Sequence, residues 1–497
     1  MAGERLSQLA DSVPDSVMTS PMVIGGTDAI ARDGGTIEVR NPAQPTEIVG
    51  TIPRASAPDV DDAVRAARAA FAEWRATPLD DRTSLLHKSG DLLAEVAPDA
   101  AITLTREMGK ILAEAQGDVA NAEFMIRTLP GEAADVLAPV RIDDDFGRVT
   151  VRREPLGVVG IIVPWNWPNV LLYMRVAEAL ATGNTVVCLP SPYASLSVLK
   201  CARALAGALP PGVLNVVTGL GVEAGAALTA HTGVEKVSFT GSIATGIEVL
   251  RSSAGTLKRT GLELGGNDPA VILEDVAVNE ELGRSLVGSA FTTTGQVCFA
   301  IKRVYVARPI YADVLEVCLA AADEIVVGDG LDPRSTMGPL VNRPQLERFD
   351  RFVDEARERG AHVLERGTRL TESDPDGYFR QPSIVTGADE TFTLVNDEQF
   401  GPALPIMAFD KVDEAVSRAN DSPFGLGASV WSADGDRARA VATRVEAGMV
   451  FLNRHDMGAA HPRGMFGGVK QSGIGRELGR WGLEGYTELR QIVDSPS

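Results

Sequence analysis

The feature that most constrains the fold is a regular alternation of short apolar runs and helical segments between residues 158 and 275. The first run, Val158–Val163, is uninterrupted, and further runs follow at 185–189, 213–217, 236–239 and 270–273. Runs of this length are typical of parallel strands that are buried on both faces. Their alternation with helices predicts βαβ units that build a doubly wound, Rossmann-like parallel sheet.

The rest of the chain predicts a second α/β unit and a projecting arm. Strand-like runs recur near 304–306, 407–409 and 428–431, within a stretch from about 280 to 470. Alternation around Val149 and Val151 indicates an exposed hairpin, and 485–493 is typical of a strand that leaves the core.

The N-terminal part predicts a loose arm, short strands and then helices. Residues 1–20 are polar and aperiodic, so we expect no regular structure there. Short strands are expected over 21–56, with turns at Gly25-Gly26 and Asn41-Pro42. Ser56 and Asp59 match a capping box that opens an amphipathic helix. Helical patterning continues to about residue 135, with breaks expected at Pro78 and Pro98.

Charge and cysteine content exclude several classes of partner. The chain carries a formal net charge of −20, so nucleic acid is not expected, because phosphate contact needs a basic patch. Its four cysteines, at 188, 201, 298 and 318, match no metal-binding spacing and form no disulfide framework, which favours a reducing cytoplasm. We expect no signal peptide and no membrane span, because the chain has no suitable apolar run.

Cys298 is the cysteine whose neighbours suggest chemistry. It follows Gly295-Gln296-Val297 in a polar loop, after a helical stretch expected over Phe291–Thr294. A loop provides the exposure and the nearby donors that a thiolate nucleophile needs. A buried, inert thiol is the alternative for any single cysteine, and it is the interpretation we adopt for Cys188, Cys201 and Cys318.

Two other polar residues stand in unusual surroundings. Glu263 lies between two leucines and before Gly265-Gly266, where burial would raise its pKa and suit it to be a general base. A solvent-facing glutamate on an edge strand is the alternative. Asn166 lies between two Trp-Pro elements in Pro164–Pro168, as a preorganised oxyanion donor or simply as part of a structural turn.

Two glycine-containing turns follow predicted strands. Gly219–Ala224 matches the dinucleotide fingerprint G-x-G-x-x-A, and Phe239–Ser242 precedes a helix start with Gly246. Backbone N–H groups at such a turn can hold a pyrophosphate. Either turn alone is weak evidence, because similar spacings occur by chance in glycine-rich chains.

Taken together, the segments resemble the aldehyde dehydrogenase superfamily, over about residues 21–495. The motifs occur in that family's order and approximate spacing: Pro164–Pro168, Phe239–Ser242, Glu263–Gly266, Gly295–Cys298, Glu398–Pro402 and Phe466–Gly473. The resemblance implies an enzyme that oxidises an aldehyde to a carboxylic acid with NAD or NADP, of which NAD is favoured. It also implies that Cys298 is the nucleophile, Glu263 the base for hydrolysis, and Asn166 an oxyanion donor.

The resemblance further implies cofactor contacts along the first sheet. Glu398 would bind the nicotinamide ribose, Phe400 would lie beside the ring, and the remaining contacts would be Ile162, Val163, Pro164, Trp165, Leu189, Ser191, Pro192, Gly221, Gly225, Phe239, Thr240, Gly241, Ser242, Leu264 and Gly265. The family usually carries a lysine and a glutamate where this chain has Leu189 and Pro192. Because both polar anchors for the adenine ribose are absent, we expect a weaker or atypical cofactor site, with the choice between NAD and NADP open.

The same resemblance implies the substrate contacts. They would be Trp167, Leu171, Met174, Val297, Phe299, His455, Arg463 and Phe466, which favours an apolar or aromatic aldehyde. The loop 454–465 would also line the substrate funnel, and it is long and carries Arg454, His455, His461 and Arg463. These four residues either face solvent, or one of them anchors a carboxylate or phenolate on the substrate.

Domain bounds and assembly also follow from the resemblance. Residues 21–138 and 158–264 would form the dinucleotide-binding domain and 265–477 the catalytic domain, after a flexible arm at 1–20. Residues 139–157 and 478–497 would form an oligomerisation arm, which predicts a homodimer or homotetramer. The alternatives are a CoA-acylating member, which would generally lack the residue matched by Glu263, a cofactor-impaired homologue that only binds thioesters, and a plain alcohol dehydrogenase.

Overall fold

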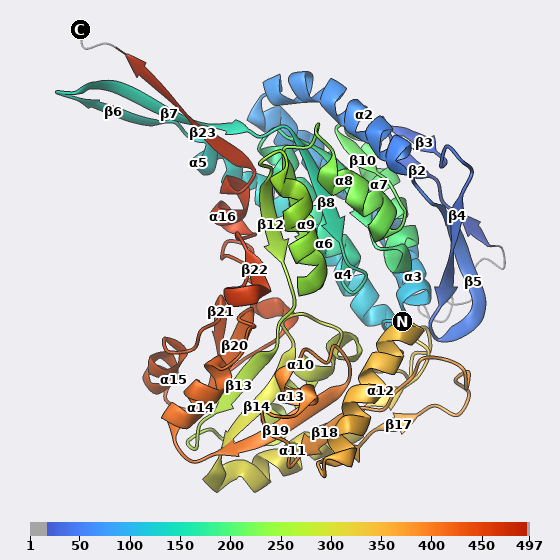
Figure 1. Ribbon diagram of the computed structural model, residues 1–497, viewed down its shortest axis with the longest axis vertical. Helices are drawn as coiled ribbons and strands as arrows, with labels where there is room; N and C mark the ends of the chain where they lie inside the picture. The colour runs from blue at the N-terminus through green and yellow to red at the C-terminus, as the bar shows by residue number, and fades with distance from the viewer. Residues whose placement is uncertain (1–16, 495–497) are drawn as a thin grey trace.

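The computed structural model describes residues 17–494. Figure 1 shows two α/β halves, each built around its own sheet, and a narrow arm that projects from the first half. The predicted fold class is confirmed, because an α/β cofactor-type sheet, a second α/β unit and a small β arm are all present. The expected loose arm falls mostly on residues outside those described. The prediction of a loose arm is wrong for Met18 and Thr19, because they form β1 (Met18–Thr19) and pair with β5 (Gln44–Pro53).

The first sheet has eight strands in the order β22-β12-β11-β8-β9-β10-β2-β3. Its five central strands run parallel to one another: β8 (Val158–Val163), β9 (Thr185–Pro190), β10 (Leu214–Val216), β11 (Lys236–Thr240) and β12 (Arg259–Glu263). The outer strands β2 (Met22–Ile24), β3 (Thr27–Ala29) and β22 (Gly473–Ile474) run antiparallel. Because β22 covers β12, the strand that carries Glu263 is not an edge strand.

Side chains that alternate along these strands enter separate cores on the two faces. From β8, Val159, Ile161 and Val163 join one apolar cluster, and Val158 joins another. The first cluster is covered by α3 (Leu79–Met108), α4 (Leu112–Thr128), α6 (Pro168–Ala181) and α7 (Ser195–Ala206). The second is covered by α2 (Ala57–Ala76), α8 (Ala226–Ala230) and α9 (Ile243–Ala254). Burial on both faces explains why the strands read as uninterrupted apolar runs.

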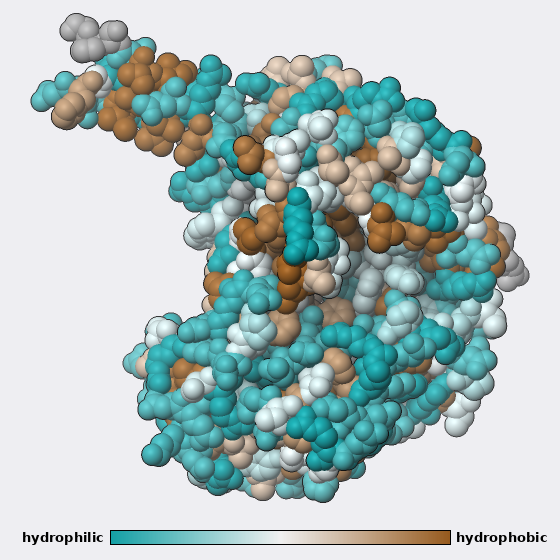
Figure 2. Space-filling model, in the orientation of Figure 1, coloured by the Kyte–Doolittle hydropathy of each residue, from teal (hydrophilic) through white to brown (hydrophobic). Residues whose placement is uncertain are grey.

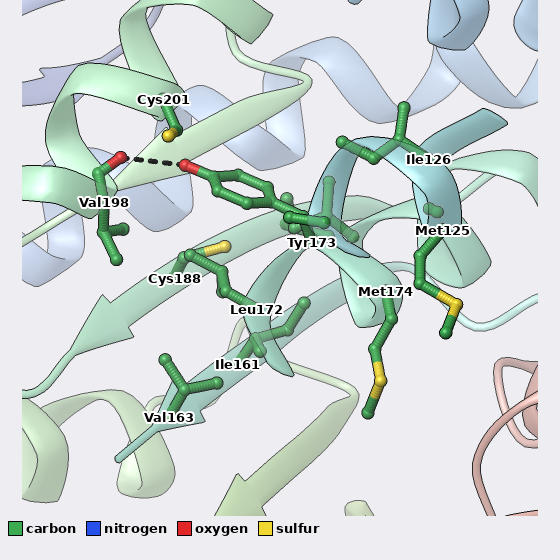
Figure 3. Packing of buried hydrophobic residues seen from close by; sticks show 14 of the residues in the cluster. Met125, Ile126, Ile161, Val163, Leu172, Tyr173, Met174, Cys188, Val198 and Cys201 are labelled. Atoms are coloured by element: carbon green, nitrogen blue, oxygen red, sulfur yellow. Dashed lines mark hydrogen bonds between the residues drawn. The ribbon is translucent and has the colours of Figure 1, made fainter. Parts of the chain in front are cut away.

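Figure 3 shows the first cluster from close by. Tyr173 of α6 donates from its hydroxyl to the Val198 carbonyl of α7 at 2.8 Å, and the thiols of Cys188 and Cys201 lie near its ring. Met125 and Met174 extend to the opposite side. Burial raises the pKa of both thiols well above the usual range, so these two cysteines fit the inert interpretation.

The N-terminal helices differ from expectation at one proline. Asp59 accepts hydrogen bonds from the Ser56 N–H at 2.8 Å and from the Ser56 hydroxyl at 2.6 Å, so α2 begins as its capping residues predict. The chain breaks before α3 at Pro78, as expected. The predicted break at Pro98 is wrong, because α3 continues through it as one helix of 30 residues. Packing of α3 against α4 and α7 provides the tertiary contacts that outweigh the lost backbone hydrogen bond.

The second sheet has seven strands in the order β16-β18-β19-β14-β13-β20-β21. They are β13 (Asp268–Ile272), β14 (Ile301–Ala307), β16 (His362–Glu365), β18 (Ser383–Thr386), β19 (Ala403–Phe409), β20 (Gly427–Trp431) and β21 (Met449–Leu452). The predicted strand at 270–273 therefore belongs to this sheet and not to the first. Its helices are α10 (Glu280–Phe291), α11 (Tyr311–Asp323), α12 (Arg343–Glu358), α13 (Thr393–Asn396), α14 (Val412–Asn420) and α15 (Gly435–Ala442).

The arm is a three-stranded antiparallel sheet. A hairpin of β6 (Val140–Asp144) and β7 (Gly147–Pro155) pairs along β7 with β23 (Thr487–Asp494), which follows α16 (Gly479–Glu484). Figure 1 shows it extending away from both halves, and Figure 2 shows an apolar patch along it. The exposed apolar side chains of the arm are Val140, Ile142, Phe146, Leu489, Ile492 and Val493.

The remaining elements are short. They are β4 (Thr36–Asn41), α5 (Ala133–Leu137), β15 (Val326–Val327), β17 (Thr368–Arg369), and the single-turn segments η1 (Leu129–Glu132), η2 (Pro192–Ala194), η3 (Gly221–Gly225), η4 (Thr292–Gly295), η5 (Arg308–Ile310), η6 (Met457–Ala459) and η7 (Lys470–Ser472). Among residues 17–494, no helix is both long and apolar enough to cross a membrane.

Candidate functional site

The loop that carries Cys298 leaves α10 through a strained turn. The helix ends at Phe291, and the expected helical stretch over Phe291–Thr294 continues only as the single turn η4, whose inner residues leave the right-handed helical conformation. Thr293, Thr294 and Gly295 then have φ values of 52°, 60° and 72°, a left-handed conformation that threonine rarely adopts. A Glu114 carboxylate accepts from the Thr293 N–H at 2.7 Å, and the Thr294 hydroxyl donates to the Gly338 carbonyl at 2.9 Å. These contacts hold the turn, and Cys298 follows it half-buried.

Two cavities meet at Cys298. One, of about 210 Å³, lies at the carboxyl ends of β8, β11 and β12, and the other, of about 260 Å³, lies on the side of α4 and α6. Asn166 and Cys298 line both cavities. The carboxyl edge of a parallel sheet is where ligands bind in doubly wound folds. The thiol therefore has access both to a ligand at the sheet edge and to a second ligand on the opposite side.

The cavity at the sheet edge contains most of the residues predicted for the inner part of the cofactor. Its lining includes Pro164, Trp165, Thr240, Gly241, Ser242, Leu264, Gly265, Glu398 and Phe400. The Ser242 hydroxyl accepts from the Thr245 N–H at 3.2 Å and caps α9. Gly246 lies one turn into that helix, where a Cβ would come within 2.6 Å of Leu264. A side chain at this position would require Leu264 to move, so glycine favours the close approach of the helix to the end of β12.

Glu398 is directed into this cavity. Its Oε1 accepts from the Gly266 N–H at 3.0 Å, and a Cβ on Gly265 would collide with its Oε2. Burial raises the pKa of its carboxyl, and the charge of Lys302 opposes that shift. The neighbouring Phe400 packs edge-on against Trp165, with ring centroids 5.6 Å apart. A buried carboxylate beside a pair of glycines fits a hydroxyl-rich ligand such as the ribose of a dinucleotide.

Two further residues of this cavity escaped prediction. Gln345 and Arg348 project from α12 in the second half of the molecule. Gln345 donates from Nε2 to the Phe400 carbonyl at 2.8 Å. Their helix is strongly amphipathic and carries many charges, so the sequence offers no signal that separates these two from its solvent-facing side chains.

The second cavity is almost entirely apolar. Six predicted substrate contacts line it: Trp167, Leu171, Met174, Val297, Phe299 and Phe466. Part of the predicted loop 454–465 also lines it, through Met457, Gly458, Ala460 and Pro462. The lining residues that escaped prediction are Asn121, Phe124, Met125, Val170 and Leu478. Phe299 and Phe466 pack edge-on with ring centroids 5.6 Å apart. Trp167 donates from its indole N–H to the Thr293 hydroxyl at 3.1 Å, so this wall is fixed to the strained turn.

The other two predicted substrate contacts, Arg463 and His455, lie outside this cavity. The prediction that their side chains contact the substrate there is therefore corrected. Arg463 is exposed and pairs with Glu132 at 2.9 Å, because a charged guanidinium is better solvated outside an apolar cavity. His455 is buried beneath the Cys298 loop, where its Nε2 lies 2.7 Å from the Phe299 carbonyl oxygen. Arg454 pairs with Asp456 at 2.7 Å.

Asn166 is buried beside the thiol. It donates from Nδ2 to the Gln296 carbonyl at 2.9 Å, which leaves one Nδ2 hydrogen free of that bond, and its Oδ1 has no partner among the described residues. Burial raises the pKa of the Cys298 thiol to about 12, and the positive charge of Lys302 opposes that rise. The resting thiol is therefore protonated near neutral pH, and an oxyanion beside it would find an amide donor in a poorly solvated site.

Glu263 is buried but faces neither of these cavities. It lines a third cavity of about 490 Å³ with Lys236, Arg476 and Glu477. A Cβ on Gly467 would lie 2.7 Å from its Oε1. Burial, together with the charge of Glu477, raises the pKa of Glu263 well above its usual range. The solvent-facing alternative is excluded, and the carboxyl has the raised pKa of a general base, but its side chain must turn to reach Cys298.

The outer cofactor contacts predicted near β9 lie outside the 210 Å³ cavity. Leu189 is buried and approaches Gly225, where a Cβ would lie 3.4 Å from its side chain. Ser191 donates from its backbone to the Val163 carbonyl at 3.1 Å, and Pro192 begins η2. Gly221 begins η3, and Ile162 packs beside Leu189 in the same apolar cluster. The outer end is therefore built largely from apolar groups.

A doubly wound sheet with a glycine-lined cavity at its carboxyl edge, joined to a unit that presents a half-buried thiol, defines a dinucleotide-dependent enzyme. Comparison with known proteins identifies the family to which this enzyme belongs. The chain belongs to the aldehyde dehydrogenase family, whose sequence profile matches residues 30–492. It is an oxidoreductase that acts on small aldehydes with NAD or NADP.

Its relatives include enzymes of known substrate class and known structure. A chloroplastic aminoaldehyde dehydrogenase of Arabidopsis thaliana is 38% identical over 467 residues, which is 92% of either chain. The NAD+ complex of an aldehyde dehydrogenase from Bacillus cereus has a TM-score of 0.92 at 34% identity and covers 98% of each chain. An NADP-dependent enzyme of E. coli has a TM-score of 0.92 at 31% identity and covers 99% of each chain.

Proposed function

We propose that this enzyme oxidises an apolar or aromatic aldehyde to its carboxylic acid through a thioester on Cys298. The meeting of the two cavities at Cys298 and Asn166 carries the proposal. The Cys298 thiolate attacks the aldehyde carbonyl and forms a C–S bond. The Asn166 side chain and the Cys298 N–H stabilise the oxyanion of the resulting thiohemiacetal. Bound NAD or NADP supplies the acceptor for the hydride that leaves this carbon.

Hydrolysis then completes the reaction. Glu263 takes a proton from water, the hydroxide adds to the thioester carbonyl, and the Cys298 thiolate leaves as the carboxylic acid forms. The Glu263 side chain faces the third cavity, beside Gly467. The hydrolysis step therefore requires this side chain to turn towards Cys298. Replacing Glu263 with Gln should preserve thioester formation and abolish its breakdown. A Glu263→Gln enzyme that turns over normally would contradict this role.

Residues of the first sheet, together with the segment that precedes β19, would hold the cofactor. Glu398 beside Gly265 would bind the nicotinamide ribose, and the N-terminus of α9 at Ser242 would bind the pyrophosphate. The adenine ribose would lie near Leu189 and Pro192, which offer it no charged partner. NAD is favoured over NADP, because Leu189 and Pro192 provide no cation for a 2′-phosphate, and Arg54, which contacts η3, is already paired with Glu223. Tryptophan fluorescence titration with each cofactor tests this preference, and tighter binding of NADP would contradict it.

An apolar substrate fits the 260 Å³ cavity better than a cationic one. Among the described residues that line it, none is charged, although the Arabidopsis relative is named for aminoaldehydes. Desolvating a cation without a carboxylate partner is unfavourable. A matched pair tests this: 6,6-dimethylheptanal and 5-(trimethylammonio)pentanal share shape and differ in charge. We expect kcat/KM to favour the neutral aldehyde by roughly tenfold or more. Equal or reversed preference would contradict the proposal.

The arm supports a proposal for assembly. Its side chains include Phe146, which is 96% exposed, and Leu489, which is 58% exposed. Apolar groups gathered on a projecting sheet favour burial against a second copy of the chain. We therefore expect a homodimer or homotetramer by light scattering at micromolar concentration, and a monomer would contradict this.

We propose that the chain divides into three parts. The arm would comprise residues 139–157 and 478–497. The cofactor domain would comprise 21–138 and 158–264, and the catalytic domain 265–477.

A cytoplasmic location is proposed on cysteine chemistry. All four cysteines are free thiols, which is the usual state in a reducing compartment. Fractionation of cells that express the tagged chain tests this, and recovery from an organelle or an oxidising compartment would contradict it.

One alternative reaction has a specific observation in its favour. Because Glu263 faces neither cavity that contains Cys298, the thioester could instead be transferred to a thiol such as CoA. In that reaction the CoA sulfur would replace Cys298 on the acyl carbon. Activity that depends on added CoA would support the alternative, and full activity without CoA would support hydrolysis.

A further inference from the structure

The Cys298 loop is held from behind by two buried side chains. Lys302, at the start of β14, donates from Nζ to the Val297 carbonyl and contacts the Cys298 carbonyl at 3.4 Å. His455 contacts the next carbonyl, that of Phe299, at 2.7 Å. Three successive carbonyl oxygens therefore point towards these two side chains. Because a trans peptide directs its N–H opposite to its carbonyl, the Cys298 N–H points away from Lys302.

Lys302 is an unusual residue for this position. It is only 2% exposed, and the lysine ion pairs among the described residues are those of Lys110 and Lys470, so Lys302 has no carboxylate within ion-pair distance. Its other neighbour is the Phe400 ring, whose centroid is 5.7 Å from Nζ. A buried ammonium without a carboxylate partner is unfavourable for stability. A neutral donor could hold the same carbonyls without that penalty, so the charge itself requires an explanation.

The charges around Cys298 provide the explanation. After burial, the groups that most affect the pKa of its thiol are Lys302, Glu398, Asp268 and Glu263, in that order. The three carboxylates all disfavour a thiolate, and Lys302 is the only one of the four that favours it. His455, the other group behind the loop, lies 3.5 Å from Asp268 and is directed at that carboxylate as well as at the loop.

We infer that Lys302 is a positioning residue that fixes the Cys298 loop and supplies the fixed positive charge that stabilises the Cys298 thiolate before any cofactor binds. The inference rests on the proposed role of Cys298 as nucleophile. Lys302 would then contribute to activation of the thiol even when no ligand is bound.

Alkylation of Cys298 by iodoacetamide, followed over a range of pH without cofactor, tests the inference. The assay reports on one thiol, because Cys188, Cys201 and Cys318 are buried, and Cys298→Ala provides the blank. Lys302→Gln removes the charge but keeps a donor, and Lys302→Arg keeps the charge. Lys470→Gln is the matched control, because Lys470 also donates to two carbonyls, those of Asn420 and Ser422, but pairs with Glu446 outside this site.

We expect the wild-type, Lys302→Arg and Lys470→Gln enzymes to share one alkylation midpoint. Lys302→Gln should have a higher midpoint and react roughly tenfold more slowly below it, since one pKa unit corresponds to a tenfold change in thiolate. An unshifted midpoint in Lys302→Gln would overturn the inference. Equal slowing in Lys302→Arg and Lys302→Gln would also overturn it, because loop geometry alone would then explain the effect.

A second variant keeps the test decisive if Lys302→Gln fails to fold. Glu398→Gln removes a charge that opposes Lys302, so its midpoint should fall, and an unchanged midpoint would count against the inference. Failure of the proposed function is distinguishable from failure of this inference. Aldehyde oxidation by Cys298→Ala would refute the nucleophile itself, whereas unshifted alkylation with an inactive Cys298→Ala enzyme would refute only the role of Lys302.

Discussion

The junction of the two cavities and the outer end of the cofactor region are built from different chemistry. At the junction, Cys298, Asn166 and Glu398 are polar groups in a largely buried setting, and hydrogen bonds to the backbone hold Asn166 and Glu398 in place. At the outer end, Leu189 and Pro192 provide no charge, and Leu189 packs into an apolar cluster. Polar groups in a dry site give strong and directional interactions. We therefore expect catalysis to depend steeply on the junction and only modestly on the outer end.

The largest expected effect is loss of the thiol at the junction. Cys298→Ala should lower kcat for aldehyde oxidation by roughly 10³-fold or more, because no other group at the junction can form the covalent bond. Cys188→Ala is the matched control, since that thiol is buried in the core of the first half. Steady-state production of reduced cofactor measures both. Near-normal turnover by Cys298→Ala would contradict the claim that catalysis depends more on the junction than on the outer end of the cofactor region.

The next effect is a pH dependence that originates from Glu263. Burial raises the pKa of this carboxyl, and a general base acts only when deprotonated. Hydrolysis of the thioester should therefore slow as pH falls through the raised pKa of Glu263, by about tenfold for each further pH unit. Single-turnover measurement of acyl release checks this. A rate that stays flat far below neutral pH would contradict a buried base.

A smaller effect is expected for the ribose-binding carboxylate at the inner end. Glu398→Gln should raise the cofactor Kd by about one to two decades, because a charged hydrogen bond contributes roughly 1.5–3 kcal/mol. Glu365→Gln, which alters an exposed ion pair with Arg357, serves as the control. Fluorescence titration measures both constants. Equal affinities in the two variants would show that the junction does not hold the ribose.

The smallest effect should come from restoring polar anchors at the outer end. The double substitution Leu189→Lys with Pro192→Glu should tighten NAD binding by about tenfold, since it adds one or two hydrogen-bonding partners for the adenine ribose. Loss of the Leu189 packing will offset part of this gain. Unchanged or weaker binding would mean that the outer end already holds the adenine ribose by other groups.

Much of the fold follows from local patterns, and its exceptions have tertiary causes. Val158–Val163 indicated a strand buried on both faces, and alternate residues of β8 do enter separate cores. The capping pair Ser56 and Asp59 acts within four residues, so it was predictable. Pro98 was not, because packing of α3 against its neighbours outweighs a local helix breaker. The assignment of 270–273 to the second sheet depends on pairing with β14 and β20, which no local pattern encodes.

The candidate site divides in the same way. Motif order brought together Cys298, Asn166 and Glu398, which lie around one cavity. It could not predict Gln345 and Arg348, which reach that cavity from a charged helix, nor the direction in which the Glu263 side chain faces. His455 was expected at the substrate and lies instead behind the loop, because side-chain direction in a long loop depends on contacts with Ser429, Phe299 and Asp268.

Trapping the covalent intermediate tests the central claim most directly. The Glu263→Gln enzyme is mixed with NAD and a neutral aldehyde, quenched after one turnover and digested for mass spectrometry. The account predicts that the Cys298 peptide gains the mass of the aldehyde less two hydrogens, in step with one equivalent of reduced cofactor. Reduced cofactor with an unmodified Cys298 peptide, or an acyl group on another residue, would contradict it.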